Sequence, residues 1–304
     1  MDQNAASNEL IHLCLEAYFR LLRGMAGRER IADIKDRCIA AGLLRYLWNR
    51  EDQWTAFVLR DAEAAHWLAY LSIPEGLFHL MLEWIKVDTP EKVVASSDGR
   101  EHFLWRGILL RSLIKAHFSH ATDSADEPMK IFFGVLDSVR ETWQAHRSSN
   151  PVVPGKVKVL PVQWLNVSSS PSAMEISKAL SQGGYPRTDP RLYNRFVGYM
   201  AKYAPKSTES QREMAIVRLH LRHPTKPQAN TAIGFLRKHF DNKTRDEGLA
   251  FLPPHRSGRE MFRITFREAS RVARNTGMQA EAAWLDQKRE DLFPPGFGPP
   301  KSRA

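Results

Sequence analysis

The sequence predicts an all-α protein built as an α-solenoid, a right-handed superhelix of stacked antiparallel helix pairs. Three observations support this. Apolar residues recur at helical spacing, Gly and Pro separate the periodic segments, and no convincing strand pattern competes with them. The chain of 304 residues is long enough for roughly seven or eight helix pairs of about 34–40 residues each.

The clearest boundary between two helices lies in residues 172–194, SAMEISKALSQGGYPRTDPRLYN. The apolar period ends at Gly183-Gly184, and glycine adopts the left-handed conformation after a helix at the lowest cost. Asp189 is expected to cap the next helix, with Pro190 at its first position, where a missing N–H does no harm. Since a single helix pair cannot bury its own apolar face, further pairs are expected beside it.

Residues 1–147 are predicted to form an N-terminal helical-repeat region. Between residues 8 and 47 we expect two helices, separated at Gly24 to Gly27, and further pairs over 52–86 and 103–143. The apolar face expected for the first helix is Leu10, Leu13, Cys14, Ala17, Tyr18, Leu21 and Leu22. That of the second is Ile31, Ile34, Cys38, Ala41 and Leu44. Six tryptophans at apolar positions are expected in the core: Trp48, Trp54, Trp67, Trp84, Trp105 and Trp143.

The helical pattern fails over residues 148–171, where four prolines and the run VKVLPV occur. This composition indicates an irregular Pro/Ser-rich segment, with a short strand or a degenerate repeat as alternatives. A basic helical-repeat region is predicted over 172–292, with helices at 172–181, 191–202, 210–222, 228–240, 244–251, 259–276 and 279–292. The Pro/Gly-rich residues 293–304 predict a disordered tail.

Positive charge is concentrated in the second half of the chain. Residues 1–150 contain 18 Lys and Arg against 21 Asp and Glu, a net charge of −3. The other 154 residues contain 26 against 13, a net charge of +13. This asymmetry predicts a polyanion as the partner of the C-terminal half, with a basic surface that binds no nucleic acid as the alternative.

The two cysteines, Cys14 and Cys38, are too few for a disulfide scaffold or a cysteine-ligated zinc module, and both are expected to be buried. The sequence contains no run of 18 apolar residues, so no membrane span is predicted. The first residues, MDQNAASNELIH, resemble neither a secretory signal nor an Arg-rich presequence. This favours a cytosolic or nuclear protein, or a sequence that lacks its true N-terminus.

Repeated helix starts connect the chain to a known family. Leu192-Tyr193-Asn194 and Gln228-Ala229-Asn230 open apolar helices with their asparagines 36 residues apart, and Met261-Phe262-Arg263 follows 33 residues later. Together with GGYPRTDPRLYN, these segments resemble the repeat boundary of the pentatricopeptide repeat (PPR) family. The resemblance is good over about residues 172–240 and fair over 100–147 and 241–290. Its mixed character is similar to that of fungal organellar PPR-like proteins that act in mitochondrial gene expression.

The resemblance implies binding of single-stranded RNA, one base per repeat. It places Asn194 at a base-reading position with Thr225 as its partner at the repeat end, Asn230 at the next reading position, and Asp189 at the end of the preceding repeat. It also implies a mitochondrial location, a role in RNA processing, stability or translation, and the mitochondrial ribosome or assembly proteins as further partners. Nearby basic residues would attract the phosphates, among them Arg195, Lys202, Arg237 and Lys238.

A protein-binding scaffold of tetratricopeptide (TPR) type, such as a respiratory-complex assembly factor, stays open as the alternative, because such arrays share the helix pair and the period. The common catalytic and nucleotide-binding motifs do not occur in the sequence, which favours a protein that is not an enzyme and has no cofactor. Two histidine pairs at i, i+3 spacing lack further metal ligands, so no metal site is predicted: His117 with His120, and His220 with His223.

Overall fold

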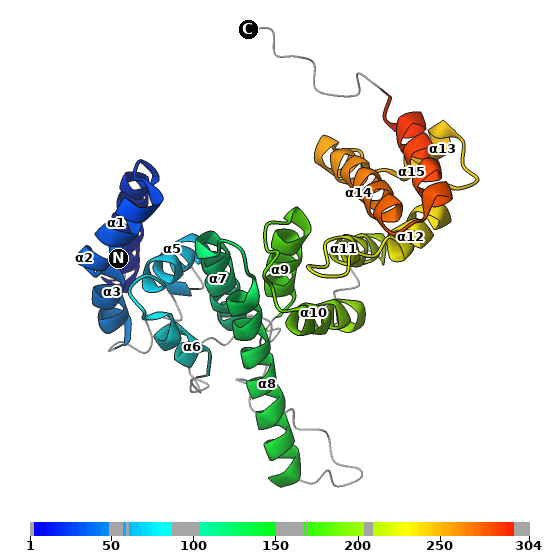
Figure 1. Ribbon diagram of the computed structural model, residues 1–304. Helices are drawn as coiled ribbons and strands as arrows, with labels where there is room; N and C mark the ends of the chain where they lie inside the picture. The colour runs from blue at the N-terminus through cyan, green and yellow to red at the C-terminus, as the bar shows by residue number, and fades with distance from the viewer. Residues whose placement is uncertain are drawn as a thin grey trace, which may run out of the picture. The chain divides into compact units, whose positions relative to one another are not determined.

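The computed structural model describes residues 3–48, 57–58, 61–86, 104–149, 167, 169–203 and 209–294. These residues form fourteen helices and no strand, which confirms the all-α prediction (Figure 1). The chain divides into two compact units, residues 1–179 and 180–304. The division falls within a helix, whereas most of the predicted irregular segment and of the Pro/Gly tail lies outside the described residues.

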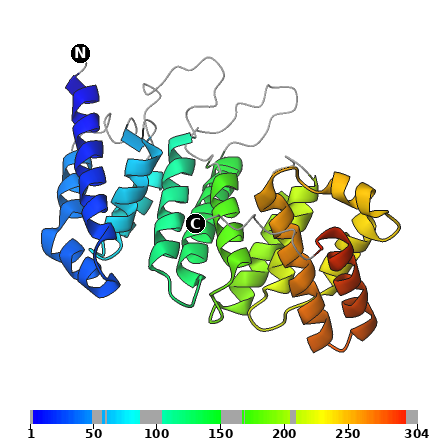
Figure 2. The same cartoon turned by 90° about the horizontal axis from the view of Figure 1, so that it is seen from above.

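The first unit is organised around one central helix. Its elements are α1 (Gln3–Arg23), α2 (Gly27–Arg37), α3 (Ile39–Trp48), α5 (Ala62–Ser72), α6 (Phe78–Lys86), α7 (Leu104–His120) and α8 (Asp126–Ser149). Helix α5 contacts α1, α3, α6 and α7, and Figure 2 shows the helices of this unit packed side by side. Its sequence, AEAAHWLAYLS, is rich in alanine, so neighbouring helices can approach it closely, and most of its residues are buried. Asp61 caps it by accepting hydrogen bonds from the N–H groups of Glu63 (3.1 Å) and Ala64 (2.8 Å).

The single helix expected around residues 31–44 is in fact two helices, and that prediction was wrong. Cys38 ends α2 in a left-handed conformation (φ 48°) and the chain restarts as α3 at Ile39. The carboxylate of Glu75 accepts hydrogen bonds from the N–H groups of Ala40 (2.9 Å) and Ala41 (2.8 Å). It thereby satisfies donors in the first turn of α3 from a distant part of the chain.

Helix α1 buries only part of the face expected for it. Tyr18 and Leu22 are buried as predicted, together with Ile11 and Leu15, whereas Leu10, Leu13 and Leu21 are exposed. Cys14 and Cys38 are both exposed, which corrects the expectation that they are buried. Among the tryptophans, Trp67, Trp84 and Trp105 are buried as predicted, but Trp48 is 45 % exposed and stacks on Trp84. Trp54 and the side chain of Trp143 lie outside the described residues.

Helix α9 (Ser170–Gln182) runs across the division between the units. The second unit continues with α10 (Pro190–Tyr203), α11 (Glu209–Leu221), α12 (Asn230–Phe240), α13 (Arg245–Phe251), α14 (Arg256–Asn275) and α15 (Gln279–Leu292). Its core is aromatic, with Phe235, Phe240, Phe262 and Phe266 buried together. Phe293, which was assigned to the tail, is also buried, against Phe266. None of the helices in the described part of the chain has both the length and the apolar character needed to cross a membrane.

Candidate nucleic-acid interface

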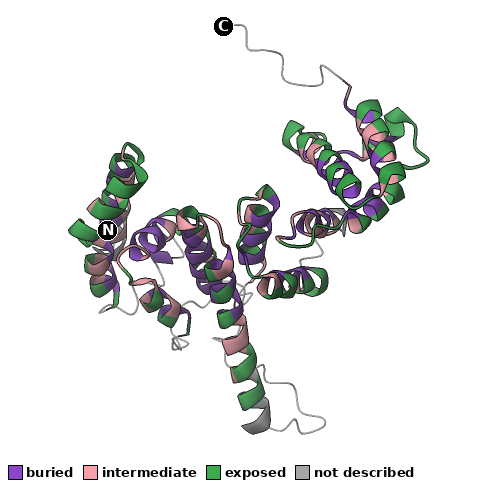
Figure 3. Ribbon diagram, in the orientation of Figure 1, coloured by how far each residue is buried: buried purple, intermediate pink, exposed green. Residues whose placement is uncertain are grey.

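Helix α14 carries a row of arginines along its exposed side. The helix buries Phe262, Phe266 and Ala269 in the core, and Figure 3 shows it exposed along one side and buried along the other. Successive arginines are three or four residues apart, which at about 100° per residue keeps them within an arc of about 120°. We call this set the arginine row: Arg256, Arg259, Arg263, Arg267, Arg271 and Arg274.

Near the middle of the row, one buried carboxylate pairs with Arg222, and three further arginines are close enough to repel that guanidinium. Glu268 is only 6 % exposed and pairs with Arg222 at the end of α11, with Arg222 Nε donating to Glu268 Oε2 at 3.0 Å. Burial, followed by repulsion from Arg271, Arg218 and Arg267, lowers the pKa of the Arg222 guanidinium, which nevertheless stays charged. We call this set the Glu268 cluster: Glu268, Arg218, Arg222, Arg267 and Arg271. It holds four guanidinium groups against one carboxylate, a surplus of three positive charges.

Part of this surplus positive charge is exposed to solvent. Arg267 and Arg271 are exposed, and neither makes a hydrogen bond or ion pair with another described residue. Arg218 donates from Nη2 to the carbonyl of Ser181 (2.8 Å), whereas its buried Nε has no hydrogen-bond partner within the described part of the chain. The Glu268 cluster therefore offers unused donors and net positive charge, which is the chemistry that attracts phosphate.

The glycines that end α9 have a role beyond stopping the helix. Gly183 and Gly184 have φ values of 81° and 104°, as the sequence led us to expect. A Cβ on Gly183 would lie 2.8 Å from Nη1 of Arg222. Glycine at this position therefore leaves room for the guanidinium that pairs with Glu268. The end of α9 and the Glu268 cluster are thus in direct contact.

Asn194 and Thr225, paired by the resemblance, are brought together by His223. The N–H groups of Thr225 (3.3 Å) and Lys226 (3.0 Å) donate to Nδ1 of His223. Burial, together with the charges of His220 and Lys226, lowers the pKa of His223, so its ring is neutral near pH 7 and carries its proton on Nε2. That Nε2 donates to Oδ1 of Asn194 at 3.3 Å. Asn194 is exposed, and its NH₂ group makes no hydrogen bond to any described residue, so it can donate to a ligand.

The other predicted site residues lie apart from this arrangement or have other roles. The carboxylate of Asp189 caps α10 by accepting from the N–H of Arg191 (2.8 Å), with Pro190 first in the helix, which confirms the predicted cap. Asn230 is the exposed first residue of α12, and Arg195 and Lys202 are exposed on α10.

Two of the predicted phosphate contacts interact within the protein instead. The guanidinium of Arg237 lies over the ring of Trp284, 5.4 Å from its centroid. Lys238 donates to both carboxylate oxygens of Glu213, at 3.0 and 3.3 Å. Both cations are exposed, but each already has an internal partner that a phosphate would have to displace.

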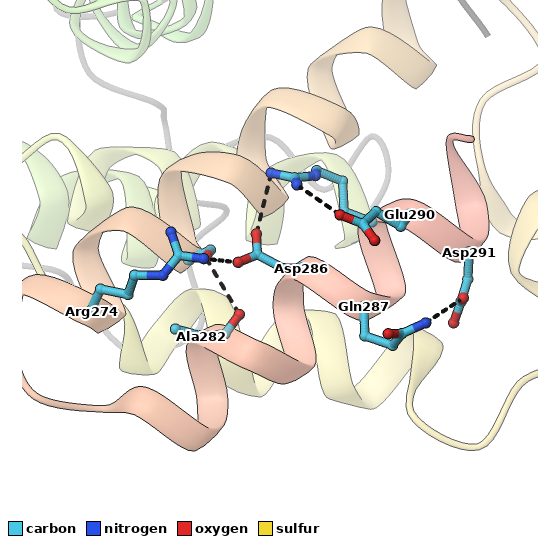
Figure 4. A network of polar contacts seen from close by, with 8 residues as sticks. Arg274, Ala282, Asp286, Gln287, Glu290 and Asp291 are labelled. Carbon is cyan, nitrogen blue, oxygen red and sulfur yellow. Dashed lines mark hydrogen bonds and ion pairs between the residues drawn. The ribbon is translucent and has the colours of Figure 1, made fainter. Parts of the chain in front are cut away.

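Acidic residues of the described part of the chain pair with two arginines of the row, Arg263 and Arg274, but not with Arg267 and Arg271 between them. Figure 4 shows Asp286 of α15 beside Arg274, and the same carboxylate pairs with Arg289 at 3.2 Å. Near the start of α14, Arg263 donates to Glu260 at 2.6 and 2.7 Å. Between these pairs, Glu268 already has Arg222 as its partner, so Arg267 and Arg271 keep their charge available.

Sequence reasoning missed the arginine row, although the signal was present. The predicted phosphate contacts were sought beside the repeat boundaries, where the resemblance placed them. Arginine at steps of three and four residues from Arg256 to Arg274 is visible in the sequence and marks one face of a helix. What the sequence did not show is that Arg218 and Arg222 of another helix lie beside the same face.

The histidine pairs have structural roles. His117 is buried and packs edge-on against Phe78, while His120 contacts the carbonyl of Tyr70 through Nε2 at 3.0 Å. Within the ranges that the structure describes, no three His, Cys, Asp or Glu side chains gather as metal ligands would. No family model matches the chain, and no curated protein or solved structure matches it.

Proposed function

We propose that this protein is a non-catalytic single-stranded RNA-binding protein whose second unit contacts the RNA. The observation that carries the proposal is the positive surplus of the Glu268 cluster, with Arg267 and Arg271 exposed and not paired with acidic groups among the described residues. A stacked, right-handed arrangement of helix pairs and a role in organellar RNA processing, stability or translation belong to the same proposal and rest on the resemblance to PPR proteins.

The spacing of the arginines suits a phosphate backbone. Residues four apart on a helix are about 6 Å apart along its axis, so Arg267 and Arg271 present two cations at that interval. A bidentate guanidinium matches the geometry of phosphate oxygens better than an ammonium does. The backbone contact would supply affinity without sequence preference, because phosphates are the same at every nucleotide.

Asn194 would add a contact to a base. His223 already donates to its carbonyl oxygen, whereas its NH₂ group has no hydrogen bond to a described residue and can donate to an acceptor on the Watson–Crick edge of an unpaired base. We therefore expect Asn194→Ala to alter the preference among homopolymeric RNAs while leaving the salt dependence of binding nearly unchanged. A parallel fall in affinity for all RNAs would contradict a base contact.

The decisive experiment is a titration of the full chain with single-stranded RNA at several salt concentrations. Each phosphate contact contributes about 0.7 to the slope of log affinity against log salt concentration. The double variant Arg267→Ala with Arg271→Ala should bind more weakly and lower the slope by about 1.4. The control, Arg20→Ala with Arg140→Ala, removes the same charge from exposed ion pairs in the first unit and should behave as the unmodified protein.

The protein-scaffold alternative makes the opposite prediction. A TPR-like scaffold would not bind RNA at low salt, and that result would overturn the RNA proposal. Binding that survives the Arg267 and Arg271 substitutions but is lost in Arg195→Ala with Lys202→Ala would move the contact to α10, where the sequence first placed it. These outcomes are distinguishable because Arg267 and Arg271 are exposed and have no hydrogen bonds to described residues whose loss would unfold the unit.

A further inference from the structure

An exposed apolar stripe runs along α1, on a side that no described residue covers. Leu10 is 63 % exposed, Leu13 53 % and Leu21 49 %, and Cys14 and Ala17 between them are also exposed. We call these five residues the α1 stripe. Their spacing places them on one face of the helix, separate from the buried face of Ile11, Leu15, Tyr18 and Leu22.

The stripe is unusual for a protein surface. It contains three of the six large apolar side chains that are most exposed in the described part of the chain. Single exposed leucines need no explanation, but a contiguous helical face of them marks a site of association. Helix α1 already packs on α5 through its buried face, so the stripe is available for a separate contact.

The charges beside the stripe indicate which partner fits. At 100° per residue, the charged residues of α1 lie along one edge of the stripe, while the buried face lies along the other. The order along that edge is acidic first and basic last: Glu9, Glu16, Arg20 and Arg23. Glu16 and Arg20 also pair with each other on the same helix, at 2.7 Å.

The acidic and basic ends of this edge match those of a second α1 helix only when the two helices run in opposite directions. If two copies of α1 lie antiparallel with their stripes in contact, Glu9 of one faces the Arg20 and Arg23 end of the other. A parallel twofold arrangement would instead place the charged edge of each helix beside the buried edge of the other, so the acidic and basic ends would not meet. We propose that the α1 stripe docks on the α1 stripe of a second copy of this chain, antiparallel, forming a symmetric dimer.

The register follows from the stripe. A twofold axis between residues 15 and 16 places Leu10 beside Leu21 of the second copy and Cys14 beside Ala17 of the second copy. The two small residues at the centre let the helix axes come close, and the leucines pack at both ends. One helix pair buries less than a standard interface, so the dimer is reversible, with a dissociation constant in the micromolar range (~1–100 μM).

Sedimentation of the full chain over a range of concentrations tests the proposal. We expect a monomer–dimer equilibrium that Leu13→Glu weakens by at least about tenfold, because it places a charge in the apolar contact. The control is Met174→Glu on α9, since Met174 is 48 % exposed and lies outside the stripe. A monomer at all concentrations, or a dimer that Leu13→Glu leaves intact, would overturn the proposal.

The two exposed cysteines provide a second test. A short bis-maleimide should cross-link the chain through Cys14 when Cys38 is replaced by serine, but not through Cys38 when Cys14 is replaced. Cross-linking through Cys38 alone would mean that a different surface associates. Charge reversal tests the direction: Glu9→Arg should weaken the dimer, and adding Arg23→Glu should restore it if the helices are antiparallel. Failure of this rescue would rule out the antiparallel register, and none of these outcomes depends on RNA binding.

Discussion

Replacing Gly183 with alanine should destabilise the second unit more than the same change at Gly277. The two glycines have nearly the same backbone conformation, with φ values of 81° and 82°. A non-glycine residue in this region costs about 1 kcal/mol in either place. Of these two glycines, only Gly183 would bring a new Cβ against another group, 2.8 Å from Nη1 of Arg222, whereas no atom of the described residues lies within 4 Å at Gly277.

The additional cost comes from the pair between Arg222 and Glu268. Complete withdrawal of the guanidinium would leave a buried carboxylate unpaired, at a cost of about 3–5 kcal/mol. Because the guanidinium is at the end of a flexible side chain, it can shift and keep part of its contact. We therefore expect Gly183→Ala to lower the free energy of unfolding by about 1–2 kcal/mol more than Gly277→Ala. This is less than the cost of breaking the pair between Arg222 and Glu268 completely.

Hydrogen exchange of the full chain measures this difference locally, in peptides from α11 and α14, without assuming that the two units unfold together. In an Arg222→Ala background the extra cost of Gly183→Ala should disappear, which a double-mutant cycle records as a coupling energy. If Gly183→Ala and Gly277→Ala cost the same in the unmodified background, the steric link between Gly183 and Arg222 is wrong.

Three further predictions follow from individual contacts. Glu75→Gln should reduce exchange protection of the Ala40 and Ala41 amides, with a loss of about 1 kcal/mol, whereas Glu63→Gln should not. Burial lowers the pKa of both His66 and His117 from 6.5 to about 4, so the unfolded chain binds more protons between these values. Stability of the first unit should therefore be complete above pH 6.5 and fall as the pH drops toward 4, by about 2 kcal/mol per histidine at pH 5. Denaturant unfolding at pH 7 and pH 5 should show that His117→Phe removes about 2 kcal/mol of this dependence, and an unchanged pH dependence would contradict it. Finally, Lys238→Met should lower RNA affinity less than Arg271→Ala, because Lys238 is already paired with Glu213.

Local signals in the sequence were sufficient to predict most helix boundaries of the second unit. The junction at Gly183-Gly184, the cap at Asp189 and the proline at the start of α10 all act within a few residues of themselves, and each is where it was predicted. The helix expected over 279–292 has the same bounds in the structure. Turn and cap chemistry of this kind depends on the chain nearby, so it can be predicted before the tertiary structure is known.

Long-range contacts explain where the predictions failed. The break at Cys38 depends on Glu75, which caps α3 from 35 residues away in the sequence. The buried face of α1 was predicted only in part, at Tyr18 and Leu22, because the helix has apolar residues on two faces and periodicity does not say which one meets the core. Contacts with other segments are consistent with the observed face: Tyr18 donates to Asp33 at 2.8 Å, and His12 pairs with Asp61.

The charge pattern of α14 is easier to explain by binding than by folding. Arginines four residues apart repel one another by about 0.2–0.5 kcal/mol per pair, and of the three such pairs in the row only Arg267 with Arg271 has no acidic partner among the described residues. A carboxylate at any exposed position between Arg267 and Arg271 would relieve this repulsion, yet the acid that lies there, Glu268, faces inward to Arg222. An anion bound across the row would relieve it instead. Single-stranded RNA at about 100 times its dissociation constant should then stabilise the second unit by about 2.7 kcal/mol. Hydrogen exchange should show added protection in α14 and none in α5, and equal protection of both helices would indicate binding that is not centred on the arginine row.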